Sequence, residues 1–236
     1  MKVLGIVPAR ANSKRVPNKN IRLLGGKPLI CHTIDVALKT KLIDKLIVST
    51  DSEKIAEISK EAGAEVPFLR PKEFALDNTP DQPVFMHVLE ILKKKNNFEP
   101  DIVLNLRPTS PFKKKSTIQK VIIEFINNSA NIVRTITKVN GVHHPYWMFN
   151  MNEKKKLSYF NSKIDINNYY QSQLLPKTYR INGVVDAYSI KAIYSNKMLD
   201  SNKLFGVEIS EEESFDIDTE FDFKICESLL SLNKNL

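Results

Sequence analysis

The chain has 236 residues, of which 42% are hydrophobic and 26% charged, the composition of an ordinary globular protein with a substantial core. No apolar run approaches the roughly 20 residues of a membrane span, and VLGIVP is shorter than the roughly 7–15-residue core of a signal peptide, so we expect a cytoplasmic protein. Much of the net charge of +8 lies in three lysine runs without interleaved aromatic residues, which favours acidic small molecules and argues against nucleic-acid binding: Lys93–Lys95, Lys113–Lys115 and Lys154–Lys156.

The first half of the chain alternates strand and helix patterns. Ser52 and Gly63 are typical of the N-cap and the C′ residue of one helix, and Ser116 opens a capping-box pattern before another. Because strands and helices alternate, we expect an α/β fold with a mostly parallel sheet covered on both faces. The pattern predicts strands over 3–8, 45–50, 65–69, 101–106 and 132–137, and helices over 29–42, 53–62, 84–95 and 116–127.

The composition and the hydrophobic pattern of the sequence change after Val139. Residues 140–180 are rich in Asn, Lys, Tyr and Pro and carry no strong helical pattern. We expect a single domain, 1–236, with residues 140–180 as an insertion, and the main pattern resumes with strands over 181–190 and 205–209 and a helix over 220–232. Exposed aromatic residues in the insertion indicate that it packs against another surface: Tyr146, Trp147, Phe149, Tyr169 and Tyr170.

The cysteines and histidines give little indication of a functional site. Cys31 and Cys226 lie in predicted helices without ligand spacing, which predicts reduced core residues. The four histidines also lack metal-site spacing. Asp186 occupies a predicted strand where an apolar residue is expected, and the pattern leaves a metal contact, a ligand contact and a solvent-facing position open.

A basic loop, VPARANSKRVPNKN, follows the first predicted strand. In open α/β sheets the carboxyl edge of the strands is where ligands bind. The loop matches neither GxGxxG nor the Walker pattern, but Arg10 is suited to bidentate phosphate binding and Lys19 to acting as a compact charge. The loop therefore predicts a phosphate site, with a solvated basic loop as the alternative.

Two acids stand near the other end, in SFDIDT. Alternation places Asp216 and Asp218 on one face of an extended segment. Neighbouring carboxylates repel unless a cation or proton lies between them, and Mg²⁺ in proteins typically takes one or two carboxylates together with substrate phosphates. The pair predicts a metal site; the alternative is a helix cap provided by Asp218 or Thr219.

A third loop, LRPTSP, follows the strand DIVLNL. Its two prolines would hold Arg107, Thr109 and Ser110 rigidly at the same edge. Ser49-Thr-Asp51 ends another strand there, and ordinary turn chemistry explains that stretch equally well.

Together these stretches resemble the signature of the acylneuraminate cytidylyltransferases, the CMP-sialic acid synthetases. The likeness spans nearly the whole chain, and its opening loop and DIDT segment are quite specific in combination. It begins with Val7-Pro-Ala-Arg10, Asn12-Ser-Lys14, Pro17 and Lys19-Asn20, and continues through Ser49-Thr-Asp51, Arg70-Pro71, Asp77, Arg107-Pro-Thr-Ser-Pro111, His143-His-Pro145, Arg180-Ile-Asn-Gly183 and Asp216-Ile-Asp-Thr219.

The resemblance implies a Rossmann-like three-layer nucleotidyltransferase that joins CMP from CTP to a nine-carbon sugar acid with Mg²⁺ and releases pyrophosphate. It implies a homodimer formed through the insertion, with His143 and His144. Catalytic cations would be Lys19 and Arg10, and metal ligands Asp216 and Asp218. The nucleotide would be bound by Ala9, Arg10, Asn12, Ser13, Lys19, Asn20, Arg70 and Asp77, and the sugar by Arg107, Thr109, Ser110, Arg180 and Asn182. The motifs offer no obvious general base.

Two departures from the family pattern fall on the sugar side. Arg107 replaces a glutamine, and Gln171-Ser-Gln173 stands where the family tends to carry an arginine. A cation gained and a cation lost point to legionaminic or pseudaminic acid instead of N-acetylneuraminic acid. The alternatives are a CMP-Kdo synthetase for an eight-carbon acid and a non-catalytic nucleotide-binding module of the same fold.

Overall fold

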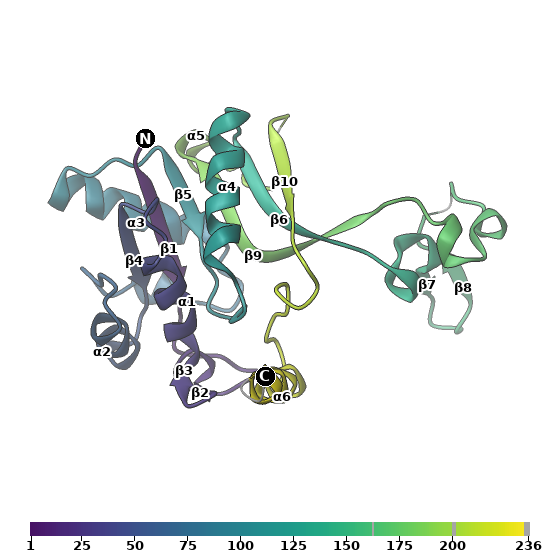
Figure 1. The fold of residues 1–236 in the computed structure, drawn as a ribbon, viewed down its shortest axis with the longest axis horizontal. Coiled ribbons are helices and arrows are strands. Elements are labelled where there is room, and N and C mark those ends of the chain that lie inside the picture. Colours follow the sequence, from purple (N-terminus) through teal and green to yellow (C-terminus); the bar gives the residue numbers. More distant parts are fainter. Residues whose placement is uncertain (162, 200–201, 234–236) are drawn as a thin grey trace.

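The computed structural model describes residues 1–161, 163–199 and 202–233. Across these ranges the centre of the molecule is a six-stranded sheet with the order β10-β6-β9-β5-β1-β4 (Figure 1). Strand β9 runs antiparallel to both neighbours, and the other pairs are parallel. The strands are β1 (Val3–Pro8), β4 (Lys45–Ser49), β5 (Ile102–Asn105), β6 (Ile132–Lys138), β9 (Tyr179–Ser189) and β10 (Leu204–Glu208).

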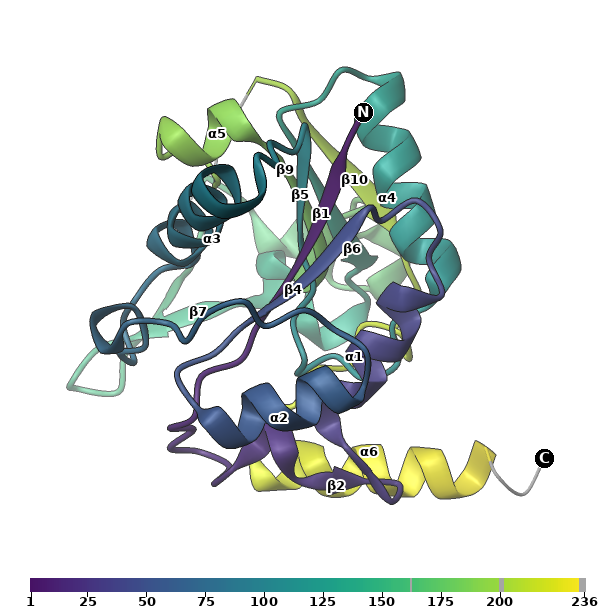
Figure 2. The ribbon, with the colours of Figure 1, turned by 90° about the vertical axis from the view of Figure 1, so that its left-hand side faces the viewer.

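Helices cover both faces of the sheet, which confirms the expected three-layer α/β fold (Figure 2). One core cluster joins the sheet to α1 (Leu29–Leu38), α2 (Glu53–Glu61) and α4 (Lys115–Asn127). A second joins the opposite face to α3 (Asp81–Asn96) and α5 (Ile190–Tyr194). Cys31 lies in the first cluster as a buried free thiol, as expected.

The C-terminal helix α6 (Glu220–Asn233) packs under the carboxyl edge of the sheet against a small hairpin, β2 (Leu23–Leu24) and β3 (Lys27–Pro28). This third cluster buries residues from both ends of the chain: Val16, Leu24, Leu29, Ile217, Phe223 and Cys226. Burial of these apolar side chains is the force that brings the acidic segment before α6 to the basic loop after β1.

Strands β6 and β9 run on beyond the sheet and carry an outlying arm (Figure 1). The arm holds the hairpin β7 (Phe149–Met151) and β8 (Leu157–Tyr159), with 3-10 turns over Gly141–His143, Pro145–Trp147, Ile166–Tyr169 and Ser172–Leu174. Some of its aromatic residues pack on one another: Tyr146 stacks edge-on against Tyr169 at 4.8 Å, and the Trp147 indole donates to the Tyr169 carbonyl at 2.6 Å. Others face outward, and Tyr170 is 71% exposed.

Several local expectations hold. Ser52 Oγ accepts the Ile55 N–H at 3.3 Å as the N-cap of α2, and Gly63 ends that helix with a φ of +94°. Others are wrong. Residues 65–69 contribute only the single bridge between Ile47 and Glu65 among the described pairings, and Ser116 is no cap, because α4 begins at Lys115.

Helix bounds differ by a few residues from the sequence pattern. Helix α1 ends at Leu38, not 42, and α3 begins at Asp81, three residues before the predicted start. Helix α5 was not predicted, because its five residues are too few for a periodic pattern. No helix in the described part of the chain has the length and apolar character needed to cross a membrane.

Candidate active site

Three hydrogen bonds fix the basic loop at the carboxyl end of β1. The Ala9 N–H donates to the Ser49 carbonyl at 2.9 Å, the Ala11 N–H to Asp51 Oδ1 at 2.8 Å, and Asn20 Nδ2 to the Arg10 carbonyl at 3.0 Å. Asp51, a plain turn residue by sequence, thus holds the loop against β4. The loop borders a cavity of about 240 Å³, with Arg10, Ser13, Lys19 and Asn20 in its lining.

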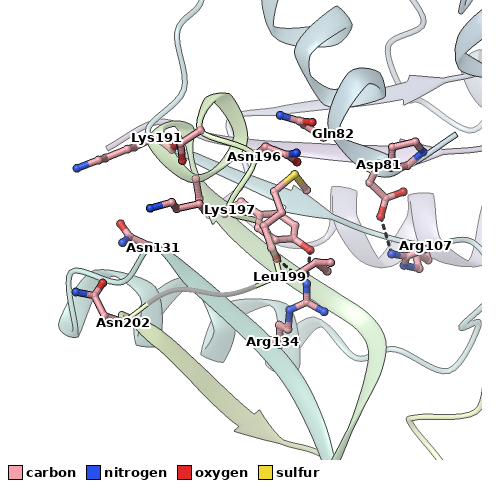
Figure 3. A pocket seen from close by; sticks show the side chains of 15 residues that line it. Asp81, Gln82, Arg107, Asn131, Arg134, Lys191, Asn196, Lys197, Leu199 and Asn202 are labelled. Carbon is pink, nitrogen blue, oxygen red and sulfur yellow. Dashed lines mark hydrogen bonds and ion pairs between the residues drawn. The ribbon is translucent and has the colours of Figure 1, made fainter.

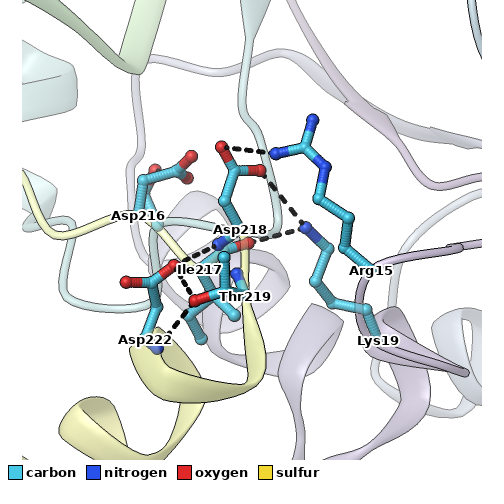
Figure 4. Close-up of polar contacts among 8 residues, drawn as sticks. Arg15, Lys19, Asp216, Ile217, Asp218, Thr219 and Asp222 are labelled. Atoms are coloured by element: carbon cyan, nitrogen blue, oxygen red, sulfur yellow. Dashed lines mark hydrogen bonds and ion pairs between the residues drawn. The ribbon is translucent and has the colours of Figure 1, made fainter.

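Lys19 reaches from this loop to the acidic segment (Figure 4). Its Nζ donates to the Ile217 carbonyl at 2.6 Å and lies 3.8 Å from Asp218 Oδ1. The side chain is only 12% exposed, and this burial lowers the pKa of Lys19, opposed by the carboxylates of Asp218 and Asp216. Arg15, which sequence reasoning passed over, pairs with the other Asp218 oxygen at 3.4 Å from a solvated position.

The acidic segment is extended, with its carboxylates on one side. Ile217 is buried and its N–H donates to the Thr109 carbonyl at 2.9 Å, while Asp216 and Asp218 project together on the opposite side (Figure 4). Ser110 Oγ donates to Asp216 Oδ1 at 3.1 Å. The LRPTSP loop therefore positions the acid pair.

The cap of α6 is supplied by other residues. Thr219 Oγ1 accepts the Asp222 N–H at 3.2 Å, and Asp222 Oδ2 accepts the Thr219 N–H at 2.8 Å. Of the two cap candidates, Thr219 takes the role and Asp218 does not. Both Asp216 and Asp218 are left for other partners.

Asp77 closes the other wall of the small cavity. Its carboxylate lies 2.5 Å from Arg10 Nη1 and also binds Lys14 Nζ. Hydrogen bonds from Lys14 and then Arg10 lower the pKa of Asp77. Arg10 therefore lines the cavity while it is paired with Asp77. Asn12 is exposed on the loop.

Arg70 lines the same cavity but directs its bonds into the protein. It is 6% exposed; Nε donates to Ser49 Oγ at 3.0 Å and Nη2 donates to the Ser49 carbonyl. Burial lowers the pKa of Arg70 to about 10. Its guanidinium braces the end of β4, and contact with a base or ribose stays a prediction.

Lys113 is buried, unlike the exposed Lys114 and Lys115 of the same lysine run. Its side chain is 2% exposed, and Nζ donates to the Arg107 carbonyl at 2.6 Å, the Ser110 carbonyl at 2.8 Å and Thr33 Oγ1 at 2.9 Å. Burial lowers the pKa of Lys113 to about 7. A buried ammonium thus folds the LRPTSP loop around itself, which a KKK run cannot reveal.

A larger cavity, about 720 Å³, lies over the face of the sheet covered by α3 and α5 (Figure 3). It shares Asp81 and Arg107 with the small cavity, and Arg107 Nη2 lies 2.6 Å from Asp81 Oδ2. Sequence reasoning missed Asp81 because it looked like the approach to a helix. The two cavities meet at this ion pair.

Two residues predicted for the sugar, Arg180 and Asn182, have hydrogen-bond partners within the protein, and their role stays a prediction. Arg180 Nη2 donates to Ser214 Oγ at 2.9 Å, and Asn182 exchanges hydrogen bonds with Thr135 at 2.6 Å and Thr137 at 2.9 Å. Among the described residues, the linings of the two cavities include neither Arg180 nor Asn182. Thr109 lines the small cavity, and Ser110 is fully buried beneath it.

The arrangement suits a polyanion and a hard cation. Arg10 and Lys19 line one cavity with the acid pair beside it. Within the described residues, no group of three or more His, Cys, Asp or Glu side chains has metal-site geometry. A metal at Asp216 and Asp218 would therefore need further oxygens from a ligand, and phosphates supply them.

Comparison with known proteins points the same way. A family model described as Cytidylyltransferase matches residues 4–230. CMP-N,N'-diacetyllegionaminic acid synthase of Legionella pneumophila is 35% identical over 237 residues, 99% of this chain and 98% of the relative. Pseudaminic acid cytidylyltransferase of Campylobacter jejuni is 34% identical over 164 residues, 69% of each chain. A CMP:2-keto-3-deoxy-manno-octonic acid synthetase complexed with CTP superposes with a TM-score of 0.72 at 16% identity, over 99% of this chain and 100% of the other, a likeness of fold.

Proposed function

The chain belongs to the cytidylyltransferase family, and on this premise we propose that it transfers CMP from CTP to the anomeric hydroxyl of a nine-carbon, sialic-acid-like sugar and releases pyrophosphate. The observation that carries the proposal is the meeting of Lys19 with Asp218, residues from opposite ends of the chain, at 3.8 Å beside the small cavity. In such a pair the lysine is suited to bind a triphosphate and the carboxylate to bind the cation that accompanies it.

Each substrate would bind in one of the two cavities. CTP would occupy the 240 Å³ cavity, with its phosphates along Arg10 and Lys19. The sugar would occupy the 720 Å³ cavity, so that its anomeric hydroxyl meets the α-phosphate near Asp81 and Arg107, the residues common to both linings. Holding the two groups in line is itself a large part of such catalysis.

The chemistry is a single displacement at phosphorus. The anomeric hydroxyl loses its proton to solvent and its oxygen forms a bond to the α-phosphorus, the bond from that phosphorus to the bridging oxygen breaks, and pyrophosphate carries the electron pair away. Lys19 and Arg10 stabilise the negative charge on the phosphates during this step. Asp216 and Asp218 would hold Mg²⁺, which when bound neutralises charge and orients the triphosphate.

The acceptor we favour is legionaminic or pseudaminic acid. Relatives named for these two acids cover 99% and 69% of the chain at 35% and 34% identity, and Arg107 stands where the sialic acid pattern has glutamine. The eight-carbon acid of the fold neighbour is the alternative; the likeness there, at 16% identity, is one of fold.

The arm supports assembly as a homodimer. It exposes a set of apolar side chains far from the sheet, at fractions up to 75%: Val142, Met151, Leu157, Phe160 and Tyr170. Surfaces of this kind mark interaction sites in soluble proteins. A second copy of the chain, seated arm to arm or arm to sheet, would cover them.

The test is pyrophosphate release from CTP and Mg²⁺ with a panel of nonulosonic acids and the eight-carbon acid. Release with legionaminic or pseudaminic acid in preference to the others supports the proposal. A clear preference for N-acetylneuraminic acid contradicts the narrower acceptor, and binding of CTP without release under any acceptor identifies a non-catalytic module.

A further inference from the structure

Lys113 holds the LRPTSP loop together from a buried position. Its Nζ donates to the Arg107 carbonyl at 2.6 Å, the Ser110 carbonyl at 2.8 Å and Thr33 Oγ1 at 2.9 Å. An ammonium has three N–H donors, and these bonds use all of them. Among the described residues, the linings of the two cavities do not include Lys113, so it has no direct access to a substrate bound there.

The three bonds join separate parts of the chain. Arg107 and Ser110 stand at the two ends of the turn in the loop, and Thr33 lies in α1 with no exposed surface. The ammonium therefore holds both ends of the turn to a helix of the core. Neither the neighbouring Lys114 nor Lys115 takes part, because both are exposed.

The loop held in this way makes two hydrogen bonds to the acidic segment. The Ile217 N–H donates to the Thr109 carbonyl at 2.9 Å, and Ser110 Oγ donates to Asp216 Oδ1 at 3.1 Å. Ser110 is thus shared, since its carbonyl accepts from Lys113 and its hydroxyl donates to Asp216. Any shift of Ser110 changes the position of Asp216.

The charge of Lys113 also serves the acid pair. The side chain is 2% exposed, and a charge removed from water is costly unless other charges compensate it. The carboxylates of Asp216 and Glu213 interact favourably with the ammonium. This interaction is mutual, so the ammonium offsets part of the repulsion between Asp216 and Asp218, which project on one side of the acidic segment (Figure 4).

We propose that Lys113 is a positioning residue for nucleotidyl transfer, which holds Asp216 through Ser110 in the place where a metal ion bound with CTP needs it, an inference that rests on the proposed function. The path runs from Lys113 Nζ to the Ser110 carbonyl, and from the hydroxyl of that serine to Asp216 Oδ1. An apolar side chain at position 113 leaves the loop carbonyls unpaired. The loop then rearranges to find other partners, and Asp216 loses its fixed position.

The test is the binding of Mn²⁺ to the enzyme with CTP and without sugar, followed by electron paramagnetic resonance. Mn²⁺ takes the same oxygen ligands as Mg²⁺, and the measurement does not depend on turnover. Lys113→Met, similar in length and without donors, is expected to lose about tenfold in Mn²⁺ affinity, because residues that orient a metal ligand typically contribute on that scale. Binding of CTP without metal changes less than about threefold, since Arg10 and Lys19 lie on another loop.

Ser110→Ala interrupts the same path at the serine hydroxyl. If Lys113 acts through Ser110, the double variant loses less affinity for Mn²⁺ than the product of the two single losses, by at least about threefold. Two independent effects would multiply. This comparison separates a path through Ser110 from a general loosening of the site.

The matched control is Leu92→Ala, which leaves a cavity in the second core cluster and lowers stability without touching the loop or the described linings of the cavities. It keeps the wild-type affinity for Mn²⁺. An equal loss of affinity in Leu92→Ala and Lys113→Met, an unchanged affinity in folded Lys113→Met, or single losses that multiply overturns the inference and leaves the proposed function standing.

Two further outcomes are decided in advance. If Lys113→Met does not fold, Thr33→Val removes one of the three acceptors, keeps the shape of the side chain and decides in the same way. Wild type that releases pyrophosphate but binds no Mn²⁺ with CTP also overturns the inference. Absence of pyrophosphate release with any nonulosonic acid removes the proposed function, and this inference with it.

Discussion

Lys19 and Arg15 offer a matched pair of substitutions, because both pair with Asp218 but only one is buried. Lys19 Nζ lies 3.8 Å from Asp218 Oδ1 with its side chain 12% exposed, and Arg15 Nη1 lies 3.4 Å from Asp218 Oδ2 with its side chain 70% exposed. Lys19 also lines the small cavity, and Arg15 does not belong to that described lining. If charge at the phosphates drives turnover, the two variants must differ.

The loss of turnover expected in each variant follows from where its side chain lies. Removal of one positioned charge at a reacting centre costs about 3–4 kcal/mol, or about 10²–10³ in kcat, so Lys19→Ala loses turnover on that scale. Exposed ion pairs contribute little, so Arg15→Ala stays within about fivefold of wild type.

Pyrophosphate release at saturating CTP, Mg²⁺ and sugar measures both variants, and thermal unfolding shows that each is folded. Lys19 also bonds the Ile217 carbonyl at 2.6 Å, so a small loss of stability is expected in its variant alone. A folded Lys19→Ala enzyme that turns over within tenfold of wild type, or an equal loss in both variants, refutes the assignment of Lys19 to the phosphates.

Three further predictions concern the metal, the buried lysine and the arm. Asp218→Asn raises the Mg²⁺ concentration needed for half-maximal turnover. Asp222→Asn weakens the hydrogen bonds that Asp222 Oδ2 accepts from Thr219 at the start of α6, so it lowers stability by about 1 kcal/mol and leaves the Mg²⁺ titration unchanged. Superimposable titrations of Asp218→Asn and wild type count against the metal role. The pKa of Lys113 is about 7 in the folded protein and 10.5 for the free side chain. Between these values the unfolded state binds more protons, so wild-type stability rises with pH by up to about 1.4 kcal/mol per unit. Urea unfolding at pH 7, 8 and 9 is expected to show this rise in wild type and not in Lys113→Met, and the same pH dependence of stability in both proteins contradicts the prediction. Tyr170→Asp, at a position 71% exposed on the arm, shifts light scattering from dimer to monomer without loss of helical circular dichroism, and an unchanged mass removes the arm from the interface.

The basic loop and the acidic segment could be located from the sequence because their signals are local. The cations of the first loop and the acids of SFDIDT each lie within a short stretch, and the rules for strand ends and alternation place such stretches at the carboxyl edge. The family resemblance drawn from them is confirmed. What brings the two ends together, the burial of Val16, Ile217 and Phe223 in one cluster, has no sequence pattern of its own.

Residues set by tertiary context were missed or misjudged. Lys113 is an ordinary member of a KKK run until the LRPTSP loop wraps it, because its burial depends on carbonyls that only the folded loop presents. The stretch 65–69 has strand propensity, yet it gains a single bridge to β4 at the edge of the sheet. Both cases depend on neighbours that propensity does not describe.

The neighbours of Asp186 in the sheet could not be predicted from the sequence, for a topological reason. Asp186 was an anomaly in its own strand, and its neighbours Asn105 and Arg134 lie 81 and 52 positions away in the chain, brought into register by the antiparallel insertion of β9 between β5 and β6. Each residue alone is an unremarkable polar side chain, and only the register makes them a row. The predicted nucleotide site lies on contiguous loops, whereas these three residues lie on separate strands that only the folded sheet brings together.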